Sequence, residues 1–213
     1  MSSPVFGSRR DFLWQATVLI AGSAVSASAF GQAQETGWPV FYPLHAIQTK
    51  IEGTAKVYAE IAKGGYAETV RLETSSGQTI LDQAAEGAVA LWVFKRNLPA
   101  EKRQIVVPLE FKLTKATEKD LPKKNADGKF PKRMAKVFFP YNAQERGLQG
   151  TCEVLAELSM DGFAEKVSIE KANKSQILNQ ASLMFTLISS LGPKLAGKEG
   201  QPHTVRLPWD FKI

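Results

Sequence analysis

The sequence predicts an α+β protein of two tandem lobes, each a three-stranded antiparallel sheet with two helices on one face. Two observations carry this prediction. The chain repeats itself with an offset of 97 residues, so that Pro43 matches Pro140 and Gly53-Thr54 matches Gly150-Thr151. Within each copy, segments that alternate apolar and polar residues, typical of half-buried strands, are flanked by segments with apolar residues at helical spacing.

The repeat extends to the end of the chain. Ile80-Leu81 matches Ile177-Leu178, and residues 107–113 match residues 207–213 with the offset grown to 100, which indicates a late insertion of three residues. We therefore expect one lobe over residues 38–114 and a second, divergent lobe over residues 134–213. Residues 115–133 are rich in lysine and poor in apolar residues, which favours a basic linker. A short ordered hairpin is the alternative for that segment.

The first half of each lobe is predicted from the first copy. A short helix begins at Pro43, where proline suits the first turn, and ends at Gly53. Residues 55–61 alternate apolar and polar side chains and predict a strand. Gly64-Gly65 supplies the positive φ angles of a hairpin turn, and Val70 and Leu72 belong to the returning strand.

The second half begins with a serine cap in residues 75–78 and a long helix over residues 79–95 with an apolar stripe. Residues 104–113 form the last strand. Pro108 and its equivalent Pro208 have no N–H to donate to a ladder, so this strand is predicted at a sheet edge. An open edge can accept a visiting peptide as an added strand, although the proline can equally serve to block aggregation there.

Residues 1–33 are predicted to be a twin-arginine-type export signal rather than part of the fold. Paired arginines precede an apolar run, and small residues at alternate positions follow it, at Arg9, Arg10, Phe12, Leu13, Ala27 and Ala29. Cleavage after Ala29 and cleavage after Ala33 both remain open. The alternative is an uncleaved membrane anchor, although the run barely reaches the length of a span.

Composition excludes several classes of function. The net charge is +6, too small and too scattered to indicate nucleic-acid binding, and the single cysteine, Cys152, allows no intrachain disulfide. His45 and His203 belong to different copies without metal-ligand spacing around them, so we expect no metal, no cofactor and no catalytic site. The acidic residues of the first lobe are expected on the solvent side of their elements: Glu52, Glu60, Asp82 and Glu86.

The first copy resembles the C-terminal domain of the TonB family. The resemblance rests on Tyr42-Pro43, on residues 51–54, on Gly65 and residues 75–77, on residues 81–85 and 92–95, and on Val107-Pro108 with residues 111–113. In that family a peptide from the plug of an outer-membrane transporter is added to the sheet edge. By resemblance, the partner-binding residues here are Tyr42, Pro43, Ile105, Val107, Pro108 and Leu109, and the second lobe would offer Val205, Leu207 and Trp209.

The expected protein is a periplasmic, non-enzymatic binding or scaffold protein that recognises an envelope protein by strand addition. An energy transducer of the TonB family carries a proline-rich spacer between its anchor and its domain, and this chain has none. An inner-membrane anchored transducer is one alternative, and an exported enzyme or cofactor carrier is another. The helix over residues 177–191 is apolar on nearly every side, which predicts packing against the first lobe or a homodimer partner.

Overall fold

The computed structural model describes residues 40–135, 139–192 and 203–212 together with the backbone of residues 34–36. The predicted signal, with its paired arginines and both candidate cleavage sites, lies outside these residues. In the described ranges, no helix combines the length and the apolar character that a membrane span requires.

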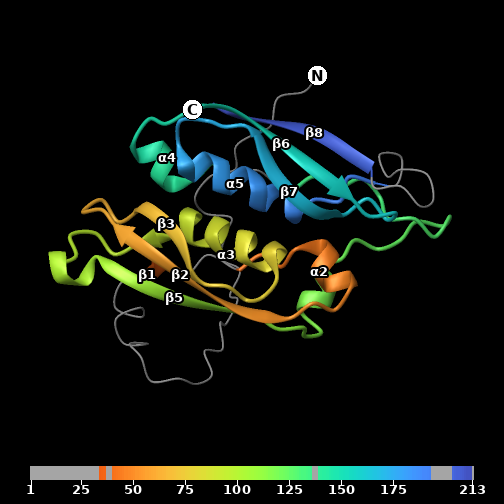
Figure 1. The fold of residues 1–213 in the computed structure, drawn as a ribbon, viewed down its shortest axis with the longest axis horizontal. Coiled ribbons are helices and arrows are strands. Elements are labelled where there is room, and N and C mark those ends of the chain that lie inside the picture. Colours follow the sequence, from red (N-terminus) through yellow and green to blue (C-terminus); the bar gives the residue numbers. More distant parts are fainter. Residues whose placement is uncertain (1–33, 37–39, 136–138, 193–202, 213) are drawn as a thin grey trace.

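Two lobes of the same design make up the described chain, and the predicted α+β class is confirmed (Figure 1). The sheet of the first lobe has the order β3-β2-β5, and the sheet of the second has the order β7-β6-β8, with all neighbours antiparallel. The elements of the first lobe are α2 (Leu44–Gln48), β2 (Gly53–Ile61), β3 (Ala67–Thr74), α3 (Thr79–Leu91) and β5 (Gln104–Phe111). Those of the second are α4 (Tyr141–Glu145), β6 (Gly150–Leu158), β7 (Ala164–Lys171), α5 (Gln176–Leu187) and β8 (His203–Phe211).

The predicted helix over residues 79–95 is too long. Helix α3 ends at Leu91, Trp92 is already extended with ψ at 147°, and Val93–Phe94 forms the short strand β4, which pairs with β1 (Gln34–Thr36). The cause lies in the β2–β3 hairpin, because the amide of Phe94 donates to the carbonyl of Gly65 at 2.8 Å. Gly65 has φ at +78°, and a Cβ there would come within 2.3 Å of the Phe94 carbonyl oxygen. The hairpin therefore requires glycine at this position.

The expectation that Asp82 and Glu86 lie on the solvent side is wrong. Asp82 is buried, and its carboxylate accepts hydrogen bonds from the amide and hydroxyl of Ser76 at 2.7 and 2.8 Å. Glu86 is half-buried and accepts the amide of Leu72 at 2.8 Å. The second lobe repeats the arrangement of Asp82 with a carboxamide in place of the carboxylate. Asn179, the equivalent of Asp82, accepts a hydrogen bond from the backbone N–H of Asn173 at 2.8 Å. Both side chains hold the loop that leads into the long helix.

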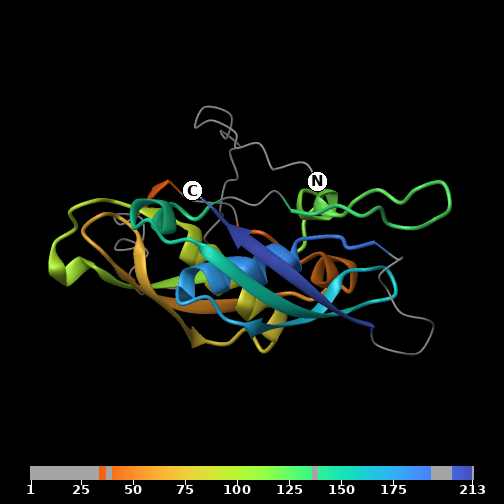
Figure 2. The ribbon, with the colours of Figure 1, turned by 90° about the horizontal axis from the view of Figure 1, so that it is seen from above.

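The two lobes face each other through their helices, which lie between the two sheets (Figures 1 and 2). Helix α5 packs along α3, which confirms the prediction that this apolar helix is buried against the first lobe. The face of α5 that contacts α3 is therefore not available to a homodimer partner. At the closest approach, Gly87 of α3 meets Met184 of α5, its equivalent in the second copy. A Cβ on Gly87 would lie 2.6 Å from the Cβ of Met184.

Hydrogen bonds repeat across this contact in matching pairs. The Gln83 side chain donates to the Val167 carbonyl at 3.0 Å, and its equivalent Gln180 donates to the Val70 carbonyl at 3.2 Å. The lobes are thus related by equivalent contacts on both sides, as the subunits of a symmetric dimer are.

The connection between the lobes is ordered rather than an extended spacer. It contains the short helix η2 (Thr117–Asp120) and a turn in which the amide of Asn125 donates to the Lys129 carbonyl at 2.8 Å. Phe130 is buried against Phe163 of the second lobe, with ring centroids 4.7 Å apart. This segment therefore contains a short helix and a turn closed by backbone hydrogen bonds.

Candidate functional site

Strand β5 lies at an edge of the first sheet, as Pro108 predicted, and none of the described strands pairs with its outer side. The direction of its backbone groups follows from one bond at its beginning. The amide of Ile61 in β2 donates to the carbonyl of Arg103 at 2.8 Å. Because backbone groups alternate sides along a strand, odd-numbered residues of β5 bond to β2 and even-numbered residues face the open edge. Pro108, which has no N–H, accordingly faces outward.

The same alternation separates the side chains. Ile105, Val107 and Leu109 are buried in the core, and the exposed side chains of β5 are those of Gln104, Val106, Pro108 and Glu110. Of the residues predicted in this strand, only Pro108 therefore offers its side chain and its backbone to a partner. The three apolar residues hold the strand on the core, while the exposed residues are their even-numbered neighbours, whose backbone groups face the open edge.

The opposite edge of this sheet, β3, is covered by side chains. The carbonyl of Val70 accepts from Gln176 and Gln180 of the second lobe, the carbonyl of Ala67 accepts from Asn142, and the amide of Leu72 donates to Glu86. These contacts occupy groups that a visiting strand would need. Among the described residues, side chains of α3, α4 and α5 thus occupy the outer side of β3, and no strand pairs with the outer side of β5.

Tyr42 and Pro43 lie beneath the end of the edge and do not project from it. Both are buried, the Tyr42 hydroxyl donates to the Ile51 carbonyl at 2.6 Å, and its ring packs edge-on against Phe111 with centroids 5.4 Å apart. Burial, together with the charge of Glu52, raises the pKa of Tyr42 to about 12. Tyr42 therefore stays neutral and serves to fix the start of β2 to the end of β5.

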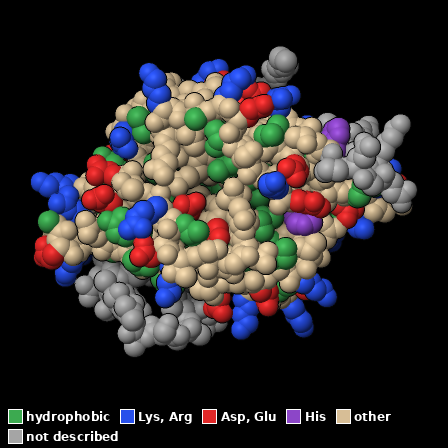
Figure 3. Space-filling model, in the orientation of Figure 1, with side chains coloured by type: hydrophobic (Ala, Val, Ile, Leu, Met, Phe, Trp, Pro, Cys, Tyr) green, Lys and Arg blue, Asp and Glu red, His purple; other side chains and the backbone are tan. Residues whose placement is uncertain are grey.

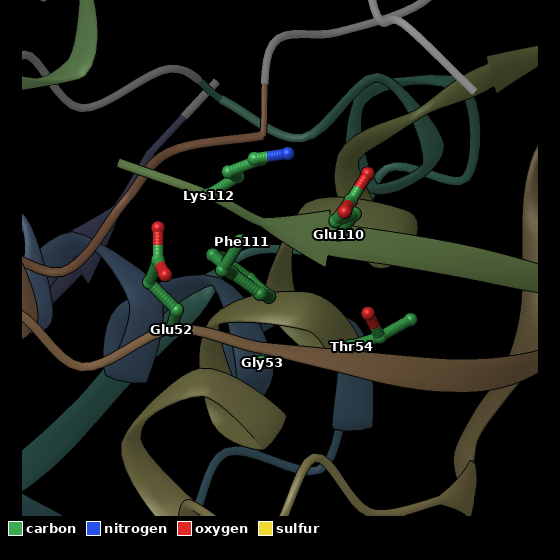
Figure 4. A pocket seen from close by; sticks show the side chains of 6 residues that line it. All are labelled: Glu52, Gly53, Thr54, Glu110, Phe111 and Lys112. Atoms are coloured by element: carbon green, nitrogen blue, oxygen red, sulfur yellow. The ribbon is translucent and has the colours of Figure 1, made fainter. Parts of the chain in front are cut away.

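A shallow hollow opens at this same end of the edge (Figure 4). It is lined by Glu52, Gly53, Thr54, Glu110, Phe111 and Lys112. The Glu52 carboxylate accepts the amide of Leu113 at 2.6 Å and so anchors the chain as it leaves β5. The hollow thus lies where the beginning of β2 pairs with the end of β5.

Strand β8 is the equivalent edge of the second lobe, but it presents different chemistry. Its exposed side chains include Arg206 and Pro208, and Arg206 donates to Glu170 at 2.6 Å. Val205 and Leu207 are only partly buried, whereas Ile105 and Val107 of the first lobe are buried. The second lobe therefore has an equivalent edge strand, but the side chains that this strand exposes differ from those of β5.

Among the residues that the structure describes, no three His, Cys, Asp or Glu side chains come together as a metal site requires. Cys152 is buried with its sulfur 2.6 Å from the Ser182 hydroxyl, and burial raises the pKa of its thiol. A thiol in such surroundings is a packing residue rather than a nucleophile.

Comparison with known proteins agrees with this architecture. The sequence model described as Gram-negative bacterial TonB protein C-terminal matches residues 39–113 and 135–213. Protein tonB2 of Pseudomonas aeruginosa is 37% identical over 75 residues, which are 34% of this chain and 28% of that protein. The chain thus spans little more than a quarter of that relative's length, and no solved structure matches it. The chain belongs to the family of Gram-negative bacterial TonB protein C-terminal domains and carries two copies of that domain in tandem.

Proposed function

We propose that this protein is a non-catalytic binding protein of the bacterial envelope that captures an extended segment of a partner protein as an added strand beside β5. The observation that carries the proposal is the contrast between the two edges of the first sheet. Strand β3 has its outer backbone groups bonded by side chains, and among the described strands β5 has a neighbour on one side only. Family membership supports the same role, because domains of this family bind outer-membrane transporters.

The even-numbered residues of β5 set what such a peptide would meet. Gln104, Val106 and Glu110 each offer an amide and a carbonyl, while Pro108 offers a carbonyl alone. An added strand would therefore have one carbonyl without a donor opposite Pro108. A bulge in the peptide at that point, or a peptide side chain that donates a hydrogen bond to that carbonyl, would fit this gap.

The outer face of the sheet gives the edge a preference for an apolar peptide residue. Val106 is 41% exposed and pairs with Tyr58 of β2, whose ring lies 4.2 Å from the guanidinium carbon of Arg71 in β3. These three side chains form one row across the sheet. A large apolar residue of the peptide beside Val106 would extend the row and bury it, as cross-strand neighbours do.

The test uses proline at an outward-facing position. Val106→Pro removes an amide that faces the open edge and leaves the β2–β5 hydrogen bonds intact. The matched control is Arg206→Pro, which makes the equivalent change in β8. We expect Val106→Pro to reduce crosslinking of partner proteins in cells at least tenfold, about the effect of losing one or two hydrogen bonds and their register.

The control variant should retain the partners crosslinked through the first lobe. Equal crosslinking by the wild type and by Val106→Pro, with both proteins folded by circular dichroism, would contradict the proposal. Loss of the same partners in Arg206→Pro alone would move the binding edge to the second lobe.

The remaining assignments belong to the same proposal. Residues 1–33 act as a twin-arginine signal that is removed, residues 38–114 bind, and the partner is an outer-membrane transporter or its plug segment. N-terminal sequencing of the protein recovered from cells tests the first of these, since a start at Phe30 or Gln34 excludes an anchored transducer. Identification of the crosslinked protein tests the last.

A further inference from the structure

A basic hairpin, residues 122–133, projects from one end of the molecule, where it extends beyond both lobes in two perpendicular views (Figures 1 and 2). All seven residues from 123 to 129 are exposed, and buried residues stand on both sides of them, Pro122 and Phe130. The hairpin is therefore an ordered projection with an anchored base rather than a loose tether.

Much of the chain's excess charge is gathered in and around this hairpin. Residues 114–133 contain seven of the Lys and Arg residues and three of the Asp and Glu residues, so they contribute a net +4 of the total +6. Over the face of the molecule seen in Figure 3, by contrast, basic and acidic side chains are interspersed. The one carboxylate within the tip, that of Asp127, is directed back to the amide of Lys129 at 3.2 Å. The tip lysines Lys123, Lys124 and Lys129 are exposed with little acidic compensation, and the Lys124 ammonium lies over the Phe130 ring, 4.9 Å from its centroid.

Exposed apolar side chains flank the base of the hairpin. The backbone of Arg133 pairs with Ser190, and Ser190 pairs in turn with Phe163, so three segments lie side by side there. Met134 follows Arg133 and is 40% exposed, and Met160, in the turn just before Phe163, is 54% exposed. Besides these two, Val106 on the β5 edge completes the set of large hydrophobic side chains that are exposed in the described part of the chain.

We infer that the basic hairpin and its two flanking methionines dock the protein on a bilayer surface that displays anionic phospholipid headgroups. Lysines attract the phosphates, and flexible apolar side chains enter the boundary between headgroups and acyl chains. A purely electrostatic partner such as a free polyanion would have no use for the methionines. The inference is independent of the β5 edge, because no residue is shared between the two surfaces.

The test measures binding of the purified protein to sedimenting vesicles at low ionic strength. Vesicles of equal parts phosphatidylglycerol and phosphatidylcholine are compared with vesicles of phosphatidylcholine alone. One variant replaces Lys123, Lys124 and Lys129 by Ser. The control replaces three exposed lysines elsewhere, Lys63, Lys95 and Lys166, by Ser, so that the net charge falls equally.

The hairpin variant should lose about 100-fold in its partition coefficient, since each lysine near an anionic surface contributes about fivefold. The control should lose less than about tenfold, through long-range attraction alone. A second variant, Met134→Ser with Met160→Ser, should have a partition coefficient about tenfold lower than that of the wild type. All of these side chains are exposed, so unchanged thermal unfolding is the expected check on folding.

Three results would overturn the inference. In the first, the wild type binds the anionic vesicles no better than the vesicles of phosphatidylcholine alone. In the second, the control variant loses as much binding as the hairpin variant. In the third, soluble heparin binds as tightly as the vesicles and the methionine variant behaves as wild type, which would identify a site for polyanions rather than for a membrane surface.

Discussion

The contact between Gly87 and Met184 offers a direct test of how the two lobes are held together. Gly87 is buried in the middle of α3, where glycine weakens a helix by about 1 kcal/mol relative to alanine. A Cβ at this position would lie 2.6 Å from the Cβ of Met184 and 3.0 Å from the carbonyl of Gln180. Neither atom can move unless helix α5 moves as well. The close approach therefore requires glycine on one side, and we propose exchanging the two residues.

The magnitudes follow from packing. Gly87→Met inserts a side chain where none fits, and overpacking of this kind costs about 1–3 kcal/mol, partly offset by better helix propensity. Met184→Gly removes a fully buried side chain and adds a helical glycine, at a cost of about 4 kcal/mol. Because the two positions are equivalent in the two copies, the exchanged pair nearly conserves volume at the contact. The double variant should be more stable than the sum of the single effects by about 2 kcal/mol or more.

Urea unfolding, followed by circular dichroism and by tryptophan fluorescence, measures each term of this double-mutant cycle. Both probes should report one transition in the wild type, because the lobes share an interface. Single and double variants whose effects add within about 0.5 kcal/mol would refute the reasoning, since independent sites behave in this way. A wild type that unfolds in two steps would likewise show that the contact does not join the lobes.

Further predictions concern the first lobe. Val106→Pro should change the free energy of unfolding by no more than about 1 kcal/mol, because that amide faces the open edge, whereas Val107→Pro, which breaks a bond to β2 and disturbs a buried residue, should cost at least about 3 kcal/mol by urea unfolding. Burial raises the pKa of Glu86 despite its hydrogen bond from the Leu72 amide. Since the folded state then holds a proton that the unfolded chain releases, stability falls as the pH rises from about 4.5 through the folded-state pKa. Glu86→Gln should therefore gain stability over wild type at neutral pH, and a gain of the same size at pH about 4 would contradict this. Asp82→Ala should lower the free energy of unfolding by about 2–4 kcal/mol, measured by thermal or urea unfolding. Asp82→Asn should lower it markedly less, because an amide fills the equivalent position in the second lobe. Equal losses in the two variants would show that charge, and not hydrogen bonding, holds the loop.

Local pattern was enough to predict most of the fold. Alternation in residues 55–61, a turn at Gly65 and a proline in the last strand are properties of neighbouring residues, and each one is found in the structure. The errors arise where a distant segment decides the outcome. Helix α3 stops at Leu91 because the hairpin carbonyl of Gly65 binds the amide of Phe94, and no periodicity in residues 79–95 records that contact.

The candidate site shows the same division. The sequence identified the edge strand but drew attention to Ile105, Val107 and Leu109, because apolar residues are conspicuous in a strand of this length. The residues that present the edge are the alternate ones, and a count from Pro108 in steps of two would have found Val106 and Glu110. The covered edge at β3 could not be foreseen, since it depends on glutamines more than 100 positions away.

The meeting of Gly87 with Met184 has a consequence for how such a protein can evolve. In a dimer of identical subunits, a residue on the symmetry axis faces its own copy, and every substitution there occurs in both subunits. A contact of glycine with methionine at equivalent positions is therefore impossible in such a dimer. Fusion of the two copies into one chain removes that constraint, so a change in one lobe is no longer imposed on the other. The same freedom allows β8 to carry Arg206 where β5 carries Val106, so the two edges can differ in their chemistry.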